Sequence, residues 1–155
     1  MTDPRLLASN GHVAHESLRG QVVAARFTSG EWQRVTAPST PILDAPGGAR
    51  LRELLLGAEF CVLDTRGGAC FGFARDDSYV GYVPADTLGH APAPTHQISA
   101  IRSSAKHVPA LKDTGPHLLL SRGARLALTG SDGSWAACSI NGQEMHLPHA
   151  HLRPL

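Results

Sequence analysis

Residues 79–88 read Tyr79-Val80-Gly81-Tyr82-Val83-Pro84-Ala85-Asp86-Thr87-Leu88, and their ending returns at residues 147–152 as Leu147-Pro148-His149-Ala150-His151-Leu152. In both copies an apolar strand runs into a proline, which ends the strand because it has no N–H to donate to the ladder. A short turn then returns a leucine to the core. This ending predicts two copies of one small β fold.

The repeat extends through the residues before this ending. In each copy a Gly-Ala pair opens an apolar run, a glycine-containing turn follows, and a second run leads on to the proline. The matching segments are Gly57-Ala58 with Gly123-Ala124, Glu59 to Asp64 with Arg125 to Thr129, residues 64–68 with 130–133, and Cys70 to Ala74 with Trp135 to Ser139. This comparison puts Trp135 in the place of Cys70, where we expect a core residue with an exposed edge.

Short apolar runs broken by turn residues favour many short strands over long helices. The chain of 155 residues holds 16 glycines and 11 prolines, which agrees with that pattern. The candidate strands of the first half are Arg34 to Ala37, Pro41 to Asp44, Glu59 to Asp64, Cys70 to Arg75 and Tyr79 to Val83. We therefore expect an all-β protein with two small barrels in tandem.

The domain boundaries follow from the segments around the repeat. Residues 13–19 predict a short helix that Gly20 closes, since glycine enters the left-handed conformation easily, and Val22 to Phe27 predict a strand. The Pro/Ala stretch at 90–95 predicts an extended, stiff linker. The expected division is an N-terminal extension at 1–34, a first barrel at 35–89, the linker at 90–95, and a second barrel at 96–155.

Charge and hydropathy exclude several classes of partner. The 14 basic and 13 acidic residues are scattered, so there is no basic stripe for nucleic acid. No stretch approaches the roughly 18 apolar residues of a membrane span. The first residues lack a basic segment leading into an apolar run, so we expect a cytoplasmic protein with neither nucleic-acid nor membrane partners.

The residues quoted above resemble a known family. The order Gly-Ala, apolar strand, glycine turn, aromatic strand and Tyr79 to Leu88 resembles a bacterial SH3 domain. The tandem arrangement is similar to the front half of NlpC-type cell-wall cysteine peptidases of the gamma-D-glutamyl-diamino-acid endopeptidase kind, and Asp3-Pro4-Arg5-Leu6 resembles their leader. The second copy departs from the pattern, because residues 142–146 lack the expected aromatic before the proline. The resemblance implies two SH3-like barrels.

The family's chemistry is not found in this sequence. NlpC-type peptidases use a cysteine at a helix N-terminus in an Asp-Cys-Ser-Gly setting, with a histidine far downstream. Cys61, Cys70 and Cys138 each lie instead in an apolar, strand-like run, so we expect three buried hydrophobes. The resemblance implies that a catalytic domain would begin after Leu155. We expect a chain that is not itself an enzyme, with the peptidase supplied by a parent or partner polypeptide.

A candidate ligand site lies at the acidic hairpin tip before the proline ending. Aromatic faces beside carboxylates suit a ligand with an apolar body and a cationic end, such as a free peptide N-terminus. The alternative is a plain turn beside half-buried barrel wall. The candidate residues are Trp32, Asp76, Asp77, Tyr79 and Tyr82, with Phe71 beside them in a shallow groove.

No cofactor or metal is expected. His146, His149 and His151 lie close in sequence, but in a turn they would point in different directions, and no carboxylate close in sequence completes a metal site.

Two functions remain open for this chain. The first is a non-catalytic module of an NlpC-type murein peptidase that binds peptidoglycan stem peptides or contacts the peptidase domain. The second is a protein–protein adaptor that binds extended or Pro-rich peptides.

Overall fold

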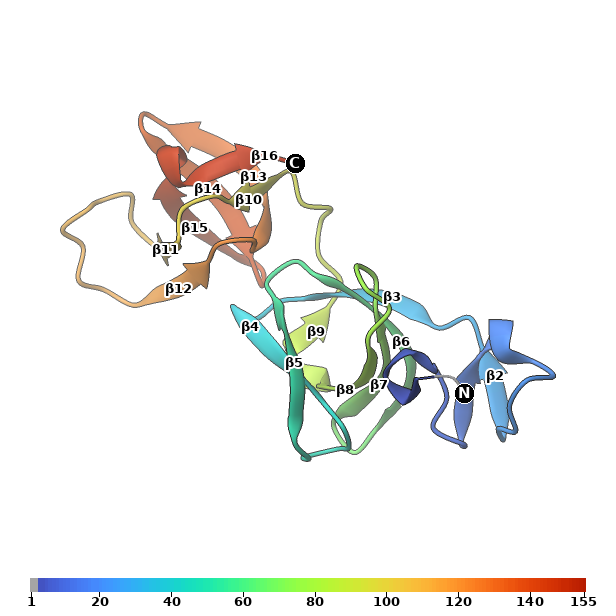
Figure 1. Cartoon of the computed structure of the whole chain (residues 1–155). Helices are drawn as coiled ribbons and strands as arrows, with labels where there is room; N and C mark the ends of the chain where they lie inside the picture. The colour runs from blue at the N-terminus through green and yellow to red at the C-terminus, as the bar shows by residue number, and fades with distance from the viewer. Residues whose placement is uncertain (1–2) are drawn as a thin grey trace. The chain divides into compact units, whose positions relative to one another are not determined.

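The computed structural model describes residues 3–155. Among these residues every helical segment is a single 3₁₀ turn of three residues, and the regular structure is otherwise made of strands. The all-β prediction is therefore confirmed. The chain forms two compact units with one seven-stranded sheet in each, whose strands are labelled in Figure 1.

The first unit comprises the chain up to Val35 together with Thr40–Leu54 and Ala58–Gly89. Its strands are β3 (Glu31–Val35), β4 (Ser39–Leu43), β5 (Arg50–Leu55), β6 (Glu59–Arg66), β7 (Ala69–Ala74), β8 (Val80–Pro84) and β9 (Leu88–Gly89). Their order in the sheet is β5-β4-β8-β7-β6-β3-β9. The edge strands β5 and β9 do not pair, and β9 is only two residues long, so the expected closure into a barrel is not confirmed.

The second unit comprises Thr36–Ser39, Leu55–Gly57 and His90–Leu155. Its strands are β10 (His96–Ile98), β11 (Arg102–Lys106), β12 (His117–Ser121), β13 (Arg125–Asp132), β14 (Trp135–Ile140), β15 (Gln143–Pro148) and β16 (Leu152–Pro154). The order is β12-β11-β15-β14-β13-β10-β16, which is the order of the first sheet, position for position. This sheet also stays open, between β12 and β16.

The strand registers correct the alignment of the two copies. A β-bulge interrupts the ladder between Val62 and Asp64 in one copy and between Leu128 and Gly130 in the other. Both following turns hold two residues, at 67–68 and 133–134, so the sequence alignment that ended the second turn at residue 133 is wrong by one. Trp135 corresponds to Ala69, because these two residues face Pro148 and Pro84 respectively.

That one-residue correction changes the face on which Trp135 lies. Neighbouring residues of a strand point to opposite sides of the sheet, so a shift by one moves a side chain from the core to the outer face. Cys70 is 3% exposed and lies in the first core, and its true counterpart, Ala136, is fully buried in the second. Trp135, next to Ala136, is half-buried.

Each unit has its own core of buried side chains, enclosed by the strands of its sheet. The first core is built around Phe60 and Ile42, and the second around Ile98, Leu120 and Met145, all of which are 1% exposed or less. In each unit a proline precedes a 3₁₀ turn, Ala85–Thr87 or His149–His151, and a leucine that is 9% exposed follows it. The prediction that this turn returns a leucine to the core is confirmed.

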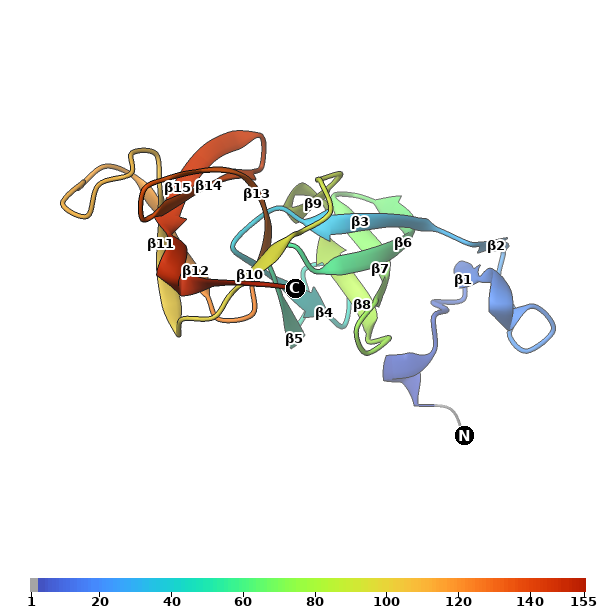
Figure 2. The same cartoon turned by 90° about the horizontal axis from the view of Figure 1, so that it is seen from above.

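The N-terminal segment differs from the sequence-based expectation. Residues 13–19 do not form a helix, because β1 (Val13–His15) pairs in parallel with β2 (Arg26–Thr28) and only a 3₁₀ turn, Glu16–Leu18, follows. So short a helix would be marginal by itself, and burial of a strand decides the outcome. Val13 is fully buried in a layer with Cys61, Leu63, Phe71 and Val80. This N-terminal segment, drawn in blue in Figure 2, belongs to the first unit.

Candidate functional site

The outer face of the first sheet carries the aromatic residues that the sequence singled out. Trp32 packs edge-on against Phe73, with ring centroids 5.6 Å apart, and Phe71 packs against Tyr82 at 5.0 Å. The N-terminal segment covers the middle of this row, so Phe71 is only 4% exposed. Phe71 is therefore buried in one cluster with Val13, and the structure does not join Trp32, Phe71 and Tyr82 in one open groove.

Trp32 and Tyr82, on either side of the covered Phe71, have different neighbours. Trp32 is 38% exposed, and the guanidinium of Arg75 lies 4.1 Å from the centroid of its ring. Tyr82 accepts a hydrogen bond at its hydroxyl from Asn10 Nδ2 at 3.1 Å. A cation therefore already occupies the face of Trp32, whereas the Tyr82 hydroxyl forms part of a pocket wall.

The acidic hairpin tip forms its own small cluster. Asp77 accepts the backbone N–H of Tyr79 at 3.1 Å and forms an ion pair with Arg52 at 2.8 Å. The same Arg52 guanidinium lies 5.3 Å from the centroid of the Tyr79 ring. The structure thus brings Asp77 and Tyr79 together, with Asp76 exposed in the same turn, but Arg52 already supplies the cation that the sequence analysis assigned to a ligand.

A pocket of about 310 Å³ opens beside Tyr82. Its wall includes Asp44, whose Oδ1 accepts the Ala49 N–H at 2.9 Å and which forms no ion pair within residues 3–155. Arg5 also lines it, and its pairing with Asp3 at 2.7 Å lowers the pKa of that carboxyl through the side-chain hydrogen bond. The pocket therefore offers an aromatic hydroxyl, one unpaired carboxylate and one neutralised arginine. Asp44 gives no functional signal in the sequence, because it reads as the end of a strand.

The three thiols lie in strands, as predicted. Cys61, Cys70 and Cys138 are buried, in β6, β7 and β14. Burial raises the pKa of Cys61, and it raises the pKa of Cys138 to about 12. Cys138 Sγ donates to the Met145 carbonyl at 3.5 Å.

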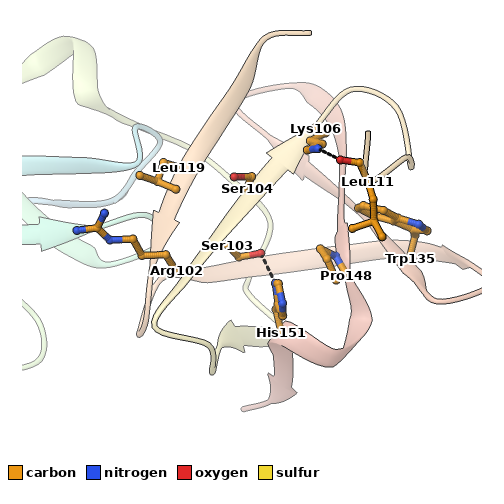
Figure 3. A pocket seen from close by; sticks show the side chains of 9 residues that line it. All are labelled: Arg102, Ser103, Ser104, Lys106, Leu111, Leu119, Trp135, Pro148 and His151. Carbon is orange, nitrogen blue, oxygen red and sulfur yellow. Dashed lines mark hydrogen bonds between the residues drawn. The ribbon is translucent and has the colours of Figure 1, made fainter. Parts of the chain in front are cut away.

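A groove of about 260 Å³ lies on the second unit, and Figure 3 shows the side chains that line it. Trp135 and Pro148, which face each other across β14 and β15, form one wall, and the exposed side chain of Leu111 lies beside the indole. His151 closes one end, where its Nδ1 meets the Ser103 hydroxyl at 2.9 Å. This groove was not predicted, because the shifted alignment placed Trp135 in the core.

The histidines of the second unit go to separate places. The rings of His149 and His96 lie edge-on with centroids 6.4 Å apart, His151 bonds Ser103, and His146 Nδ1 is buried with no partner among the described residues. Within residues 3–155 no three His, Cys, Asp or Glu side chains are placed to hold a metal ion. Nor is any helix in that range long and apolar enough to cross a membrane.

Each unit is a small all-β module with the same sheet order, a β-bulge at the same place and a 3₁₀ turn after a proline. Comparison with known proteins identifies the family of the first unit. Residues 42–88 match the family model described as the bacterial dipeptidyl-peptidase Sh3 domain. The recognition of a bacterial SH3 domain in this part of the chain is therefore confirmed. No curated protein matches the sequence.

Solved structures add the wider context. An NlpC/P60 family protein from Bacillus cereus matches with a TM-score of 0.66 at 16% identity, over 81% of this chain and 56% of that one. NlpC1 and NlpC2 from Trichomonas vaginalis match with TM-scores of 0.35 and 0.33 at 12% and 11% identity, over 99% and 79% of this chain and 50% and 47% of theirs. The chain spans about half the length of these neighbours. The first match shows a shared fold with an NlpC/P60 protein.

Proposed function

We propose that this chain is a cell-wall module that binds peptidoglycan stem peptides and presents them to an NlpC-type peptidase domain. The bacterial SH3 match and the NlpC/P60 neighbour are consistent with a cell-wall context. As part of this proposal, residues 35–89 and 96–155 act as two SH3-like barrels that take no part in the chemistry. The proposal also places the chain in the cytoplasm, acting on recycled wall peptides.

The observation that carries the proposal is the pocket beside Tyr82. A stem peptide has an ammonium group at one end and carboxylates along its length. Asp44 is available to pair with the ammonium, and the Tyr82 hydroxyl is available as a hydrogen-bond partner beside it. Arg5 lines the same pocket with its charge already paired to Asp3, so Asp44 carries the unpaired charge of the site. A shallow surface pocket gives weak binding alone, so the proposal includes a second surface supplied by the peptidase domain.

The hairpin tip has a different role in this proposal. Asp77 and Tyr79 already share Arg52, so they stiffen the turn that precedes β8. Trp32, whose face is covered by Arg75, and the exposed Asp76 are the positions where a peptidase domain would add contacts. Alanine at Tyr79 is therefore expected to weaken binding less than a change at Asp44.

A retention experiment tests the proposal. The chain is passed over purified sacculi, immobilised stem peptides and an immobilised NlpC-type peptidase domain. Asp44→Asn keeps the hydrogen bond to Ala49 but removes the charge, and Asp86→Asn removes an exposed carboxylate of the same unit outside the pocket. We expect retention by at least one of the three, reduced in D44N and unchanged in D86N. Retention by none of them would refute the proposal.

A further inference from the structure

The groove on the second unit lies outside the proposed function and exposes apolar side chains. Leu111 is 79% exposed and Leu119 is 51% exposed, and both line the groove together with Trp135 and Pro148. Contiguous exposed apolar surface with polar residues around it is typical of binding sites. Ile101, Val108 and Leu155 are also exposed in this unit but do not line the groove, so the groove is distinguished by the indole and the proline that lie beside its two leucines.

The polar side chains of the groove are cations and hydrogen-bond donors. Arg102 is exposed and forms no ion pair or side-chain hydrogen bond in the described part of the chain. The Trp135 indole N–H also has no partner within residues 3–155, and it is not a buried orphan, so solvent reaches it. No Asp or Glu side chain lines the groove. The groove therefore suits a ligand that brings acceptors and negative charge.

Two further side chains hold the walls in place. Lys106 Nζ donates to the carbonyls of Ala110, Leu111 and Asp113 at 3.4, 2.9 and 3.2 Å, which fixes the loop that carries Leu111. Lys106 therefore adds positive charge to the groove while its hydrogen bonds hold this loop in place. His151 uses Nδ1 on Ser103, a residue that is only 3% exposed, and this leaves Nε2 for a ligand.

We propose that this groove binds an extended peptide segment whose apolar residues, such as proline, lie on Trp135 and Pro148 and whose carboxylates reach Arg102. Aromatic-lined grooves take polyproline-type segments because these are already extended and lose little entropy on binding. The surplus of positive charge selects an acidic segment over a basic one.

Nuclear magnetic resonance of the ¹⁵N-labelled chain tests this inference. The chain has two tryptophans, so its two indole N–H signals report Trp32 in the first unit and Trp135 in the second. The probes are three synthetic nonapeptides, blocked at both ends, that repeat Ala-Pro-Glu, Ala-Pro-Gln or Ala-Pro-Lys. We expect the glutamate peptide to shift the Trp135 signal and leave the Trp32 signal in place, with weaker binding of the glutamine peptide and weakest binding of the lysine peptide.

Matched variants separate charge at the groove from charge elsewhere. Arg102→Gln should weaken binding of the glutamate peptide by about threefold, the size of one exposed ion pair, and this difference should vanish in about 0.5 M salt. Arg153→Gln removes an exposed arginine of the same unit outside the groove and should leave binding unchanged. No Trp135 shift with any peptide, equal binding of all three peptides, or an equal loss in R102Q and R153Q would overturn the inference. A shift of Trp32 alone would do so too, because it would move the ligand to the first unit.

Discussion

The thiols should be nearly inert while the chain is folded, and Cys138 allows the size of the effect to be worked out. Its pKa is raised to about 12 by burial, so about one Cys138 in 10⁴ is ionised at pH 8. A free thiol with a pKa of about 8.5 is about one-quarter ionised there. The more basic thiolate is roughly 40-fold more nucleophilic, so the smaller ionised fraction and the higher nucleophilicity together slow the reaction about 60-fold. Because Cys138 is 0% exposed, loss of access slows it further.

The assay compares the buried thiols with an exposed one in the same molecule. Ser134→Cys places a thiol in the exposed two-residue turn before β14, where it should react with an aromatic disulfide reagent at the rate of a free thiol. Mass spectrometry after proteolysis then follows each cysteine separately, and denaturant should release all of them. If Cys61, Cys70 or Cys138 reacts in the folded chain as fast as the exposed reference, the account of these thiols as buried strand residues is refuted.

Three further outcomes follow from the packing. Above pH 9 the unfolded chain ionises Cys138 while the folded chain keeps it neutral, so Cys138 should lower the free energy of unfolding by about 1.4 kcal/mol per pH unit toward pH 12. The slope should be smaller by about that amount in Cys138→Ala, and equal slopes in denaturant titrations would contradict this. Gly72→Ala should lower the free energy of unfolding by about 3 kcal/mol, because the added Cβ would collide with a backbone oxygen of β6. Gly130→Ala, with open space around it, should change it by less than about 0.5 kcal/mol. Similar melting curves for the two variants would count against the register of β6 and β7. Phe60→Ala should cost about 3–5 kcal/mol, while Val23→Ala, at a 94% exposed position, should be nearly neutral by urea denaturation.

Much of the fold follows from local patterns in the sequence. Proline has no N–H to donate to the ladder, so Pro84 and Pro148 at the ends of β8 and β15 located both 3₁₀ turns, although Pro41 lies inside β4. The thiols could be placed in strands because each stands in an apolar run, and such a run is buried in almost any sheet. β5 was missed for the opposite reason, since Arg50 to Glu53 are charged or exposed and show no alternation.

The strand register and the two surface sites depend on contacts between residues far apart in the sequence, which local patterns do not reveal. A strand register cannot be obtained by matching letters when the turn residues differ, as they do at Gly68 and Ser134, and this error hid the groove at Trp135. The expected groove over Phe71 failed because Val13, nearly sixty residues earlier, covers it. Asp44 gave no local signal, because its approach to Tyr82 depends on how the first sheet folds.

The proposed function is tested most directly by titrating the ¹⁵N-labelled chain with a peptidoglycan stem peptide whose amino terminus is either free or acetylated. The account predicts that the free peptide shifts backbone signals around Asp44 and Tyr82, and that acetylation or Asp44→Asn removes most of the effect. Equal shifts with both peptides, or shifts confined to residues of the second unit, would contradict it.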